Sequence, residues 1–129
     1  MNPLELPLVV GVTSHRNLAI GELEAIRERV RDFFAALRRE FPELPLVVIS
    51  ALAEGGDQLV AHEALAAGAR LIAPLPLAQA SYAEDFADGP SRAAFNGLCA
   101  RAEVVQMPQA PGYSVEETAV RGPARDRQY

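Results

Sequence analysis

The sequence has few of the residues that form cross-links, ligate metals or stack on bases. Its 129 residues include one cysteine, two histidines, no tryptophan and only 6% aromatic residues. The lone Cys99 excludes an internal disulfide, and neither it nor His62 has a second ligand at metal-site spacing, so we predict no metal site. The scarcity of aromatic side chains disfavours a base-stacking surface for single-stranded nucleic acid.

Long hydrophobic runs and an excess of basic residues are also missing. Glu5 and two nearby prolines interrupt the N-terminus, and the apolar stretches are too short to cross a bilayer, which disfavours a signal peptide and a membrane anchor. The 17 acidic and 12 basic side chains leave a net charge of −5, so attraction to a polyanion is not favoured. We therefore expect a soluble, cytoplasmic protein with neither a membrane nor a nucleic acid as partner.

Apolar runs alternate with amphipathic segments along the chain. Uncharged or β-branched runs predict strands at 6–13, 46–50, 69–73 and 103–107, with Pro74 and Pro76 ending the third. Apolar residues at three- and four-residue steps predict helices over 23–41, 58–67 and 91–102, the last capped by Ser91, and a short helical turn within 77–86. This alternation predicts an α/β fold, a Rossmann-like three-layer αβα arrangement with a parallel sheet of about four strands.

The chain divides by composition into two parts. Residues 1–108 hold all the predicted strands, whereas residues 109–129 are rich in proline, glycine and charge and have no final apolar strand. Within this tail, Ser114 followed by Glu116 and Glu117 predicts a helix to about Val120. We expect nothing further in the tail to pack beyond the fourth strand, so that it is either mobile or the start of something longer.

The segment Ser50-Ala-Leu-Ala-Glu-Gly-Gly-Asp57 joins a predicted strand to a predicted helix. Two glycines at the start of a helix can offer unpaired N–H groups and the positive end of the helix dipole to an anion such as phosphate. A tight turn between strand and helix also uses glycine without any ligand. The carboxylates of Glu54 and Asp57 would repel phosphate unless they bind a ribose hydroxyl or a cation, and Asp57 could simply complement the helix dipole.

The loop after the first strand carries the second group of candidates. Its arginine, Arg16, could form two hydrogen bonds to a phosphate, or pair with Glu54 or Asp57. His15 could donate to a ligand or act as an ordinary loop residue. The carboxyl ends of parallel strands lie at the same edge of the sheet, and ligands usually bind at this edge where the strand order reverses. The predicted ligand-binding residues, with no catalytic residue among them, are Thr13, Ser14, His15, Arg16, Ala53, Glu54, Gly55, Gly56 and Asp57.

Three segments together resemble the SLOG superfamily of Rossmann-like domains: Gly11-Val-Thr-Ser-His-Arg16, the turn ending at Asp57, and His62-Glu-Ala-Leu-Ala-Ala-Gly-Ala-Arg-Leu-Ile-Ala-Pro74. The stretch 50–73 is similar to the DNA-processing protein A family, whose turn reads Ser-Gly-x-Ala-x-Gly-x-Asp. This chain has Ala51 where that family has glycine, and Gly56 where it usually has an apolar residue. The resemblance covers roughly 8–107 and extends to the lonely-guy phosphoribohydrolases.

The resemblance implies a nucleotide-derived ligand at the strand ends, held by Thr13, Ser14, Arg16, Gly55, Gly56 and Asp57. The related hydrolases also have a Pro-Gly-Gly-x-Gly-Thr-x-x-Glu segment that supplies phosphate contacts and a catalytic carboxylate. These 129 residues contain no such segment, and we expect them to correspond to the first half or two-thirds of the usual domain. No bound cofactor is predicted, because strict dinucleotide and P-loop fingerprints are absent as well.

Four functions remain open at this point. The leading hypothesis is a sensor or regulator that binds a nucleotide or nucleotide-derived anion and has no enzymatic activity. A phosphoribohydrolase acting on nucleoside monophosphates would need Glu54, Asp57 or Glu103 in place of the absent glutamate. Single-stranded DNA binding follows from the DNA-processing resemblance alone. Self-association, which is compatible with the others, would cover the open edge of the sheet next to the fourth strand.

Overall fold

The computed structural model describes residues 6–129, and the predicted strand 6–13 lies within them. The strands are β1 (Leu8–Gly11), β2 (Leu46–Ile49), β3 (Arg70–Leu75) and β4 (Glu103–Gln106). The long helices are α1 (Leu23–Glu40), α2 (Gly56–Ala66) and α4 (Gly89–Ala100), and shorter ones are η1 (Ile20–Glu22), α3 (Gln79–Ala83), α5 (Val115–Thr118) and α6 (Pro123–Gln128). None of the helices in this range is long and apolar enough to span a bilayer.

All neighbouring strands of the four-stranded sheet are parallel, in the order β1-β2-β3-β4. This confirms the predicted α/β class and the parallel sheet of four strands. Because the strands lie in chain order, the sheet formed by residues 6–129 contains no point where the strand order reverses. A ligand at its carboxyl edge would therefore lie beside consecutive strands and not at a reversal point.

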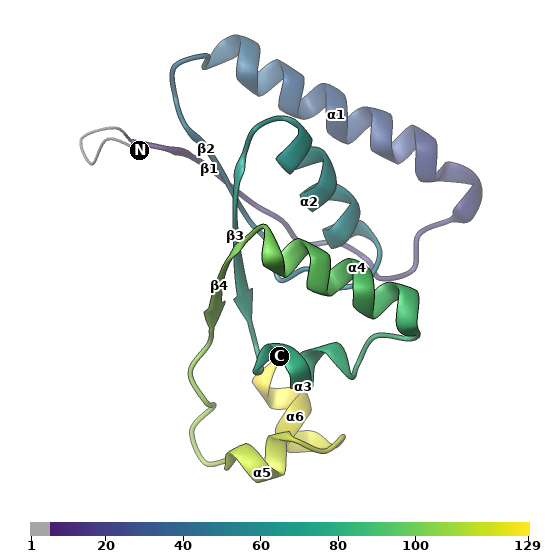
Figure 1. Ribbon diagram of the computed structural model, residues 1–129, viewed down its shortest axis with the longest axis vertical. Coiled ribbons are helices and arrows are strands. Elements are labelled where there is room, and N and C mark those ends of the chain that lie inside the picture. Colours follow the sequence, from purple (N-terminus) through teal and green to yellow (C-terminus); the bar gives the residue numbers. More distant parts are fainter. Residues whose placement is uncertain (1–5) are drawn as a thin grey trace.

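The long helices α1, α2 and α4 lie side by side on the same side of the sheet (Figure 1). Right-handed crossovers between strands in chain order place every connecting helix on the same face. The core forms between these helices and one set of alternating strand residues, including Val48 and Leu71. On the second face, Val9 and Val105 are 51% and 43% exposed. The helical cover supplied by residues 6–129 thus lies on one face, and the second face of the predicted three-layer arrangement is open.

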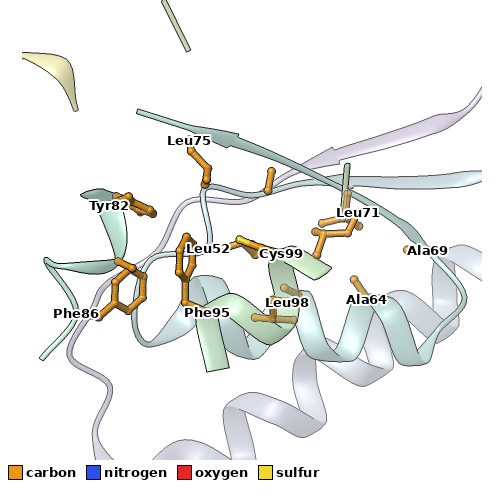
Figure 2. Close-up of a cluster of buried hydrophobic side chains, with 14 of the residues drawn as sticks. Leu52, Ala64, Ala69, Leu71, Leu75, Tyr82, Phe86, Phe95, Leu98 and Cys99 are labelled. Carbon is orange, nitrogen blue, oxygen red and sulfur yellow. The ribbon is translucent and has the colours of Figure 1, made fainter. Parts of the chain in front are cut away.

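The core continues past the carboxyl ends of the strands as an aromatic cluster. The Tyr82 ring contacts Phe86 and Phe95 edge-on, with centroids 5.5 and 5.2 Å apart, while Phe86 and Phe95 stack at 4.7 Å. Figure 2 shows these rings grouped next to Leu52 and Leu75. This packing fixes α3 against α4 at the edge of the sheet where β3 ends.

Two boundaries differ from the predictions for physical reasons. Pro74 does not end β3. The Ser50 N–H donates to Ile72 O, so the backbone groups of even-numbered β3 residues point toward β2. The ring nitrogen of Pro74 therefore lies beyond the last β2–β3 pair, where no N–H donor is needed. Helix α4 begins before Ser91, because the Asp88 carboxylate caps it by accepting from the Ser91 N–H at 2.8 Å, with Pro90 in the first turn.

The tail forms two helices where the sequence predicted one. Ser114 caps α5 as predicted, in a reciprocal arrangement in which Ser114 and Glu117 each bond the other's backbone N–H. Helix α6 follows and contacts α5. The expectation that nothing in the tail packs beyond the fourth strand was wrong, because α6 docks against α3 and the ends of β3 and β4.

Candidate functional site

The two predicted loops, after β1 and after β2, meet and are joined by Asp57. The Ser14 hydroxyl donates to Asp57 Oδ1 at 2.8 Å, and the Ala53 N–H donates to Asp57 Oδ2 at 3.3 Å. Asp57 lies in the first turn of α2 and is only 6% exposed. Both carboxylate oxygens thus have partners within the protein, and Asp57 serves as a link between loops.

The glycine turn touches the first loop so closely that side chains would not fit. The Gly56 N–H donates to His15 O at 3.1 Å. A Cβ on Gly55 would lie 2.2 Å from Arg16 O, and one on Gly56 would lie 2.3 Å from Ser14 Oγ. Gly55 also has φ of 83°, a conformation that other residues rarely adopt. Contact between the two loops therefore accounts for both glycines.

Glu54 contacts the segment before α4. Its Oε1 accepts from the Ala87 N–H at 2.5 Å, which ties the glycine turn to the segment between α3 and α4. Thr13, His15 and Arg16 are exposed. The structure thus brings the predicted residues together, but uses Ser14, Gly56, Glu54 and Asp57 in internal contacts. Neither Glu54 nor Asp57 forms an ion pair with Arg16 among the described residues.

Arg16 lines a polar cleft of about 450 Å³ beside the carboxyl edge of the sheet. On the other side of this cleft lie Arg121, Gly122 and Asp126 from the tail, with Asp85 and Tyr129 completing the wall. Two arginines from distant parts of the sequence therefore line one space. Guanidinium groups in this arrangement can bind the oxygens of a phosphate or carboxylate.

A second cleft of about 440 Å³ lies at the ends of β3 and β4. Its walls are mostly apolar and include Ala51, Pro74, Met107 and Tyr82. Tyr129 lines both clefts, and its ring lies 5.7 Å from that of Tyr82. Burial raises the pKa of Tyr82 to about 12, with Arg16 acting in the opposite direction, so Tyr82 keeps its proton at neutral pH.

The tail segment that forms one wall of both clefts is anchored by Arg125. This side chain is 3% exposed, and its Nε donates to Asp85 Oδ2 at 3.0 Å. The same guanidinium donates to Ser81 Oγ, Ser81 O and Thr118 O at 3.1, 2.6 and 2.9 Å. Burial opposes ionisation of Asp85, but hydrogen bonds from Arg125 and Tyr129 outweigh it and lower the pKa of the carboxyl.

A second anchor comes from the side chain of Gln128. Its Nε2 donates to Pro76 O and Pro108 O, both at 2.8 Å, and its Oε1 accepts from the Ala110 N–H at 2.6 Å. Gln128 thus joins the ends of β3 and β4 to the last turn of α6. These contacts hold Tyr129 at the boundary of the two clefts.

Four residues of the polar cleft were not predicted as site residues: Arg121, Asp126 and Tyr129 of the tail, and Asp85 in the segment after α3. Three arginines within 121–127 and a terminal tyrosine follow a predicted helix. From that composition, the tail was expected to be either mobile or the start of something longer. The residues that receive Arg125 are Ser81 on α3 and Asp85 just after it. Their partner could not be read from local spacing, because Arg125 lies 40 residues after Asp85.

Within residues 6–129, no group of three or more histidine, cysteine, aspartate and glutamate side chains could hold a metal ion. Cys99 is a buried free thiol in the core, and burial raises its pKa to about 11. A thiol with such a pKa is protonated at neutral pH and has low nucleophilicity.

The sequence matches no protein-family model and no curated protein. The resemblance to the SLOG superfamily therefore stays a prediction.

Proposed function

We propose that this chain is a SLOG-like domain that binds a nucleotide or nucleotide-derived anion at the carboxyl edge of its sheet and acts as a sensor or regulator. The observation that carries the proposal is the pair of adjoining clefts, one polar with Arg16 and Arg121, and one apolar with Tyr82 and Met107. A nucleotide has a corresponding division into an anionic end and a flat aromatic base, whose faces stack on apolar and aromatic side chains. Each cleft has a volume typical of small-molecule sites.

In this proposal Arg16 and Arg121 bind the anionic group, because two guanidiniums can share its oxygens. Asp126, which lines the same cleft, is the acceptor available to a sugar hydroxyl. The base lies in the apolar cleft against Tyr82, Tyr129 and Met107. Gly55, Gly56 and Asp57 contribute indirectly, by holding the loop that carries Arg16 in place. The proposal also places the protein in the cytoplasm, where nucleotides are available.

Hydrolysis has no comparable support. Glu54 and Asp57 each accept a backbone N–H, and Glu103 contacts Arg70 at 2.5 Å at the amino ends of β3 and β4, away from the clefts. Assays for released base with nucleoside monophosphates nevertheless belong in the same experiment. Base release would replace the sensor proposal with the enzyme hypothesis.

The test is a thermal-shift screen with nucleoside mono-, di- and triphosphates, NAD, ADP-ribose and cyclic nucleotides, followed by calorimetry for any ligand found. A ligand at about 100 times its dissociation constant stabilises the fold by about 2.7 kcal/mol. Arg16→Ala should remove the shift, whereas Arg39→Ala, an exposed arginine at the far end of α1, should keep it. A shift unchanged in Arg16→Ala, or no shift with any ligand, would contradict the proposal.

A further inference from the structure

The two edges of the sheet differ in how they are protected from pairing. Strand β4 has Glu103 and Gln106 at its ends, and Pro108 follows closely. Strand β1 consists of Leu8-Val9-Val10-Gly11, with no charged residue, and Pro7 directly precedes it. Charged residues and proline are the usual features that stop an edge strand from pairing with another chain. Both edges have a proline beside the strand, and they differ in that β1 has no charged residue within the strand whereas β4 has Glu103. The residues of β1 after Pro7 are therefore the more open to strand addition.

Alternate residues of β1 direct their backbone groups away from the sheet. The N–H groups of Leu8 and Val12 donate to Pro45 O and Ile49 O of the β2 side, at 2.8 and 3.0 Å. The N–H and C=O groups of Val9 and Gly11 consequently point outward, where no strand of residues 6–129 pairs with them. A Cβ on Gly11 would meet nothing within 4 Å, so a further backbone can approach there.

Helix α1 lies next to this open edge, with a stripe that includes Arg29 and Phe33 on the side toward it. Its other side faces α2, where Arg27 and Arg31 contact Glu63. Arg29 and Phe33 line a groove of about 370 Å³ together with Val10 and Val12 next to them and Val60 of α2. Phe33 is 49% exposed, although the neighbouring Phe34 is buried. The open strand edge and an exposed apolar ring thus share one side of the molecule.

The stripe continues from Arg29 and Phe33 to Ala36 and Glu40. These residues recur at steps of four, three and four, which keeps them on one side of a helix. The stripe has a cation in its first half, an acid in its last residue, and a large and a small apolar residue between them. Neither Arg29 nor Glu40 has an ion-pair partner among residues 6–129.

We propose that a second copy of this chain docks on this side about a two-fold axis. A two-fold interface requires a surface that is complementary to itself, and antiparallel α1 helices bring Arg29 of each copy toward Glu40 of the other and Phe33 toward Ala36. Beneath them the β1 strands pair antiparallel, with Val9 opposite Gly11 of the second copy. The result is a continuous eight-stranded sheet, and this inference does not depend on the proposed ligand.

Charge reversal tests the helix part of the interface. In sedimentation velocity over a concentration series, the wild type should dimerise, and Arg29→Glu should weaken dimerisation about tenfold or more, because the introduced carboxylate then faces Glu40 of the second copy. The double variant R29E/E40R should restore it, whereas Arg39→Glu, on the same helix but outside the stripe, should have no effect. Circular dichroism checks the folding of each variant. A monomeric wild type, or an unaffected Arg29→Glu, would overturn the proposal.

Cross-linking tests the strand register. With Val9 opposite Gly11, the two Val10 residues form a non-hydrogen-bonded pair with Cα atoms about 4.5 Å apart, which is within disulfide range. In a Cys99→Ala background, Val10→Cys should therefore form a disulfide-linked dimer under mild oxidation. Val104→Cys on the β4 edge should stay monomeric. Cross-linking of Val104→Cys without that of Val10→Cys would show that the opposite edge pairs.

Discussion

Asp57 and Asp85 are both carboxylates with little access to water, but they are held by different kinds of donor. Asp57 accepts from a hydroxyl and a backbone N–H of neighbouring loops, Ser14 and Ala53. Asp85 pairs with the guanidinium of Arg125, a residue of the tail. The two carboxylates bridge similar distances along the sequence, 43 residues from Ser14 to Asp57 and 40 residues from Asp85 to Arg125. They differ in the charge of the donor: neutral groups join two strand-end loops at Asp57, whereas a guanidinium joins the tail to the segment after α3 at Asp85. The comparison shows how loop geometry and tail docking each depend on one carboxylate.

The largest expected effect concerns the turn that Asp57 holds. Gly55→Ala should lower the free energy of unfolding by about 4 kcal/mol, because a Cβ would collide with Arg16 O and φ is positive. Urea titration followed by circular dichroism measures the change. The matched control is Gly97→Ala in α4, where a Cβ has open space and helix propensity predicts a slight gain. Equal effects at the two positions would contradict the close approach of the loops.

The next largest effect concerns the ion pair of Arg125 with Asp85. Arg125→Ala leaves the Asp85 carboxylate without its cationic partner and should cost about 3 kcal/mol. Part of this loss should appear as faster hydrogen exchange in α5 and α6 than in the sheet. Arg127→Ala, an exposed neighbour on α6, should change stability by less than about 0.5 kcal/mol. If both variants behave alike, Arg125 does not anchor the tail.

The ion pair should also be visible in the pH dependence of stability. The pKa of Asp85 is lowered in the folded protein, so its contribution is fully present above the unfolded value of about 3.9 and is lost as pH falls through the folded value. Denaturant titrations of the wild type between neutral and acid pH should therefore lose more stability than those of Asp85→Asn. If stability falls equally with pH in both proteins, ionised Asp85 does not stabilise the folded state.

The smallest effect concerns a neutral hydrogen bond. Ser14→Ala removes the hydroxyl that donates to Asp57 and should cost about 1 kcal/mol, less than the loss of the charged Arg125. Thr13→Ala, at an exposed position one residue earlier, serves as the control and should be nearly neutral. A larger cost for Ser14→Ala than for Arg125→Ala would reverse the ranking of the two anchors.

Elements whose signals are local could be predicted from the sequence. The apolar run 46–50 correctly predicted β2. Apolar residues spaced three and four positions apart along 23–41 correctly predicted α1, because this spacing places them on one buried side of a helix. The Ser114 cap was predicted for the same reason, since its partner Glu117 is three residues away. The contact between the two strand-end loops was expected from the parallel topology. That Asp57 accepts a hydrogen bond from Ser14, and does not bind a ligand with that oxygen, depends on how close the fold brings the two side chains.

The sequence by itself determined the α/β alternation, the parallel sheet and the meeting of two polar loops at its carboxyl edge, because periodicity and turn chemistry act over a few residues. Only the tertiary structure decided that the strands follow chain order, that the long helices share one face, and that Arg121 and Tyr129 reach Arg16 and Tyr82. These features depend on contacts such as that of Arg125 with Asp85, 40 residues apart, whose energy exists only once the chain is folded.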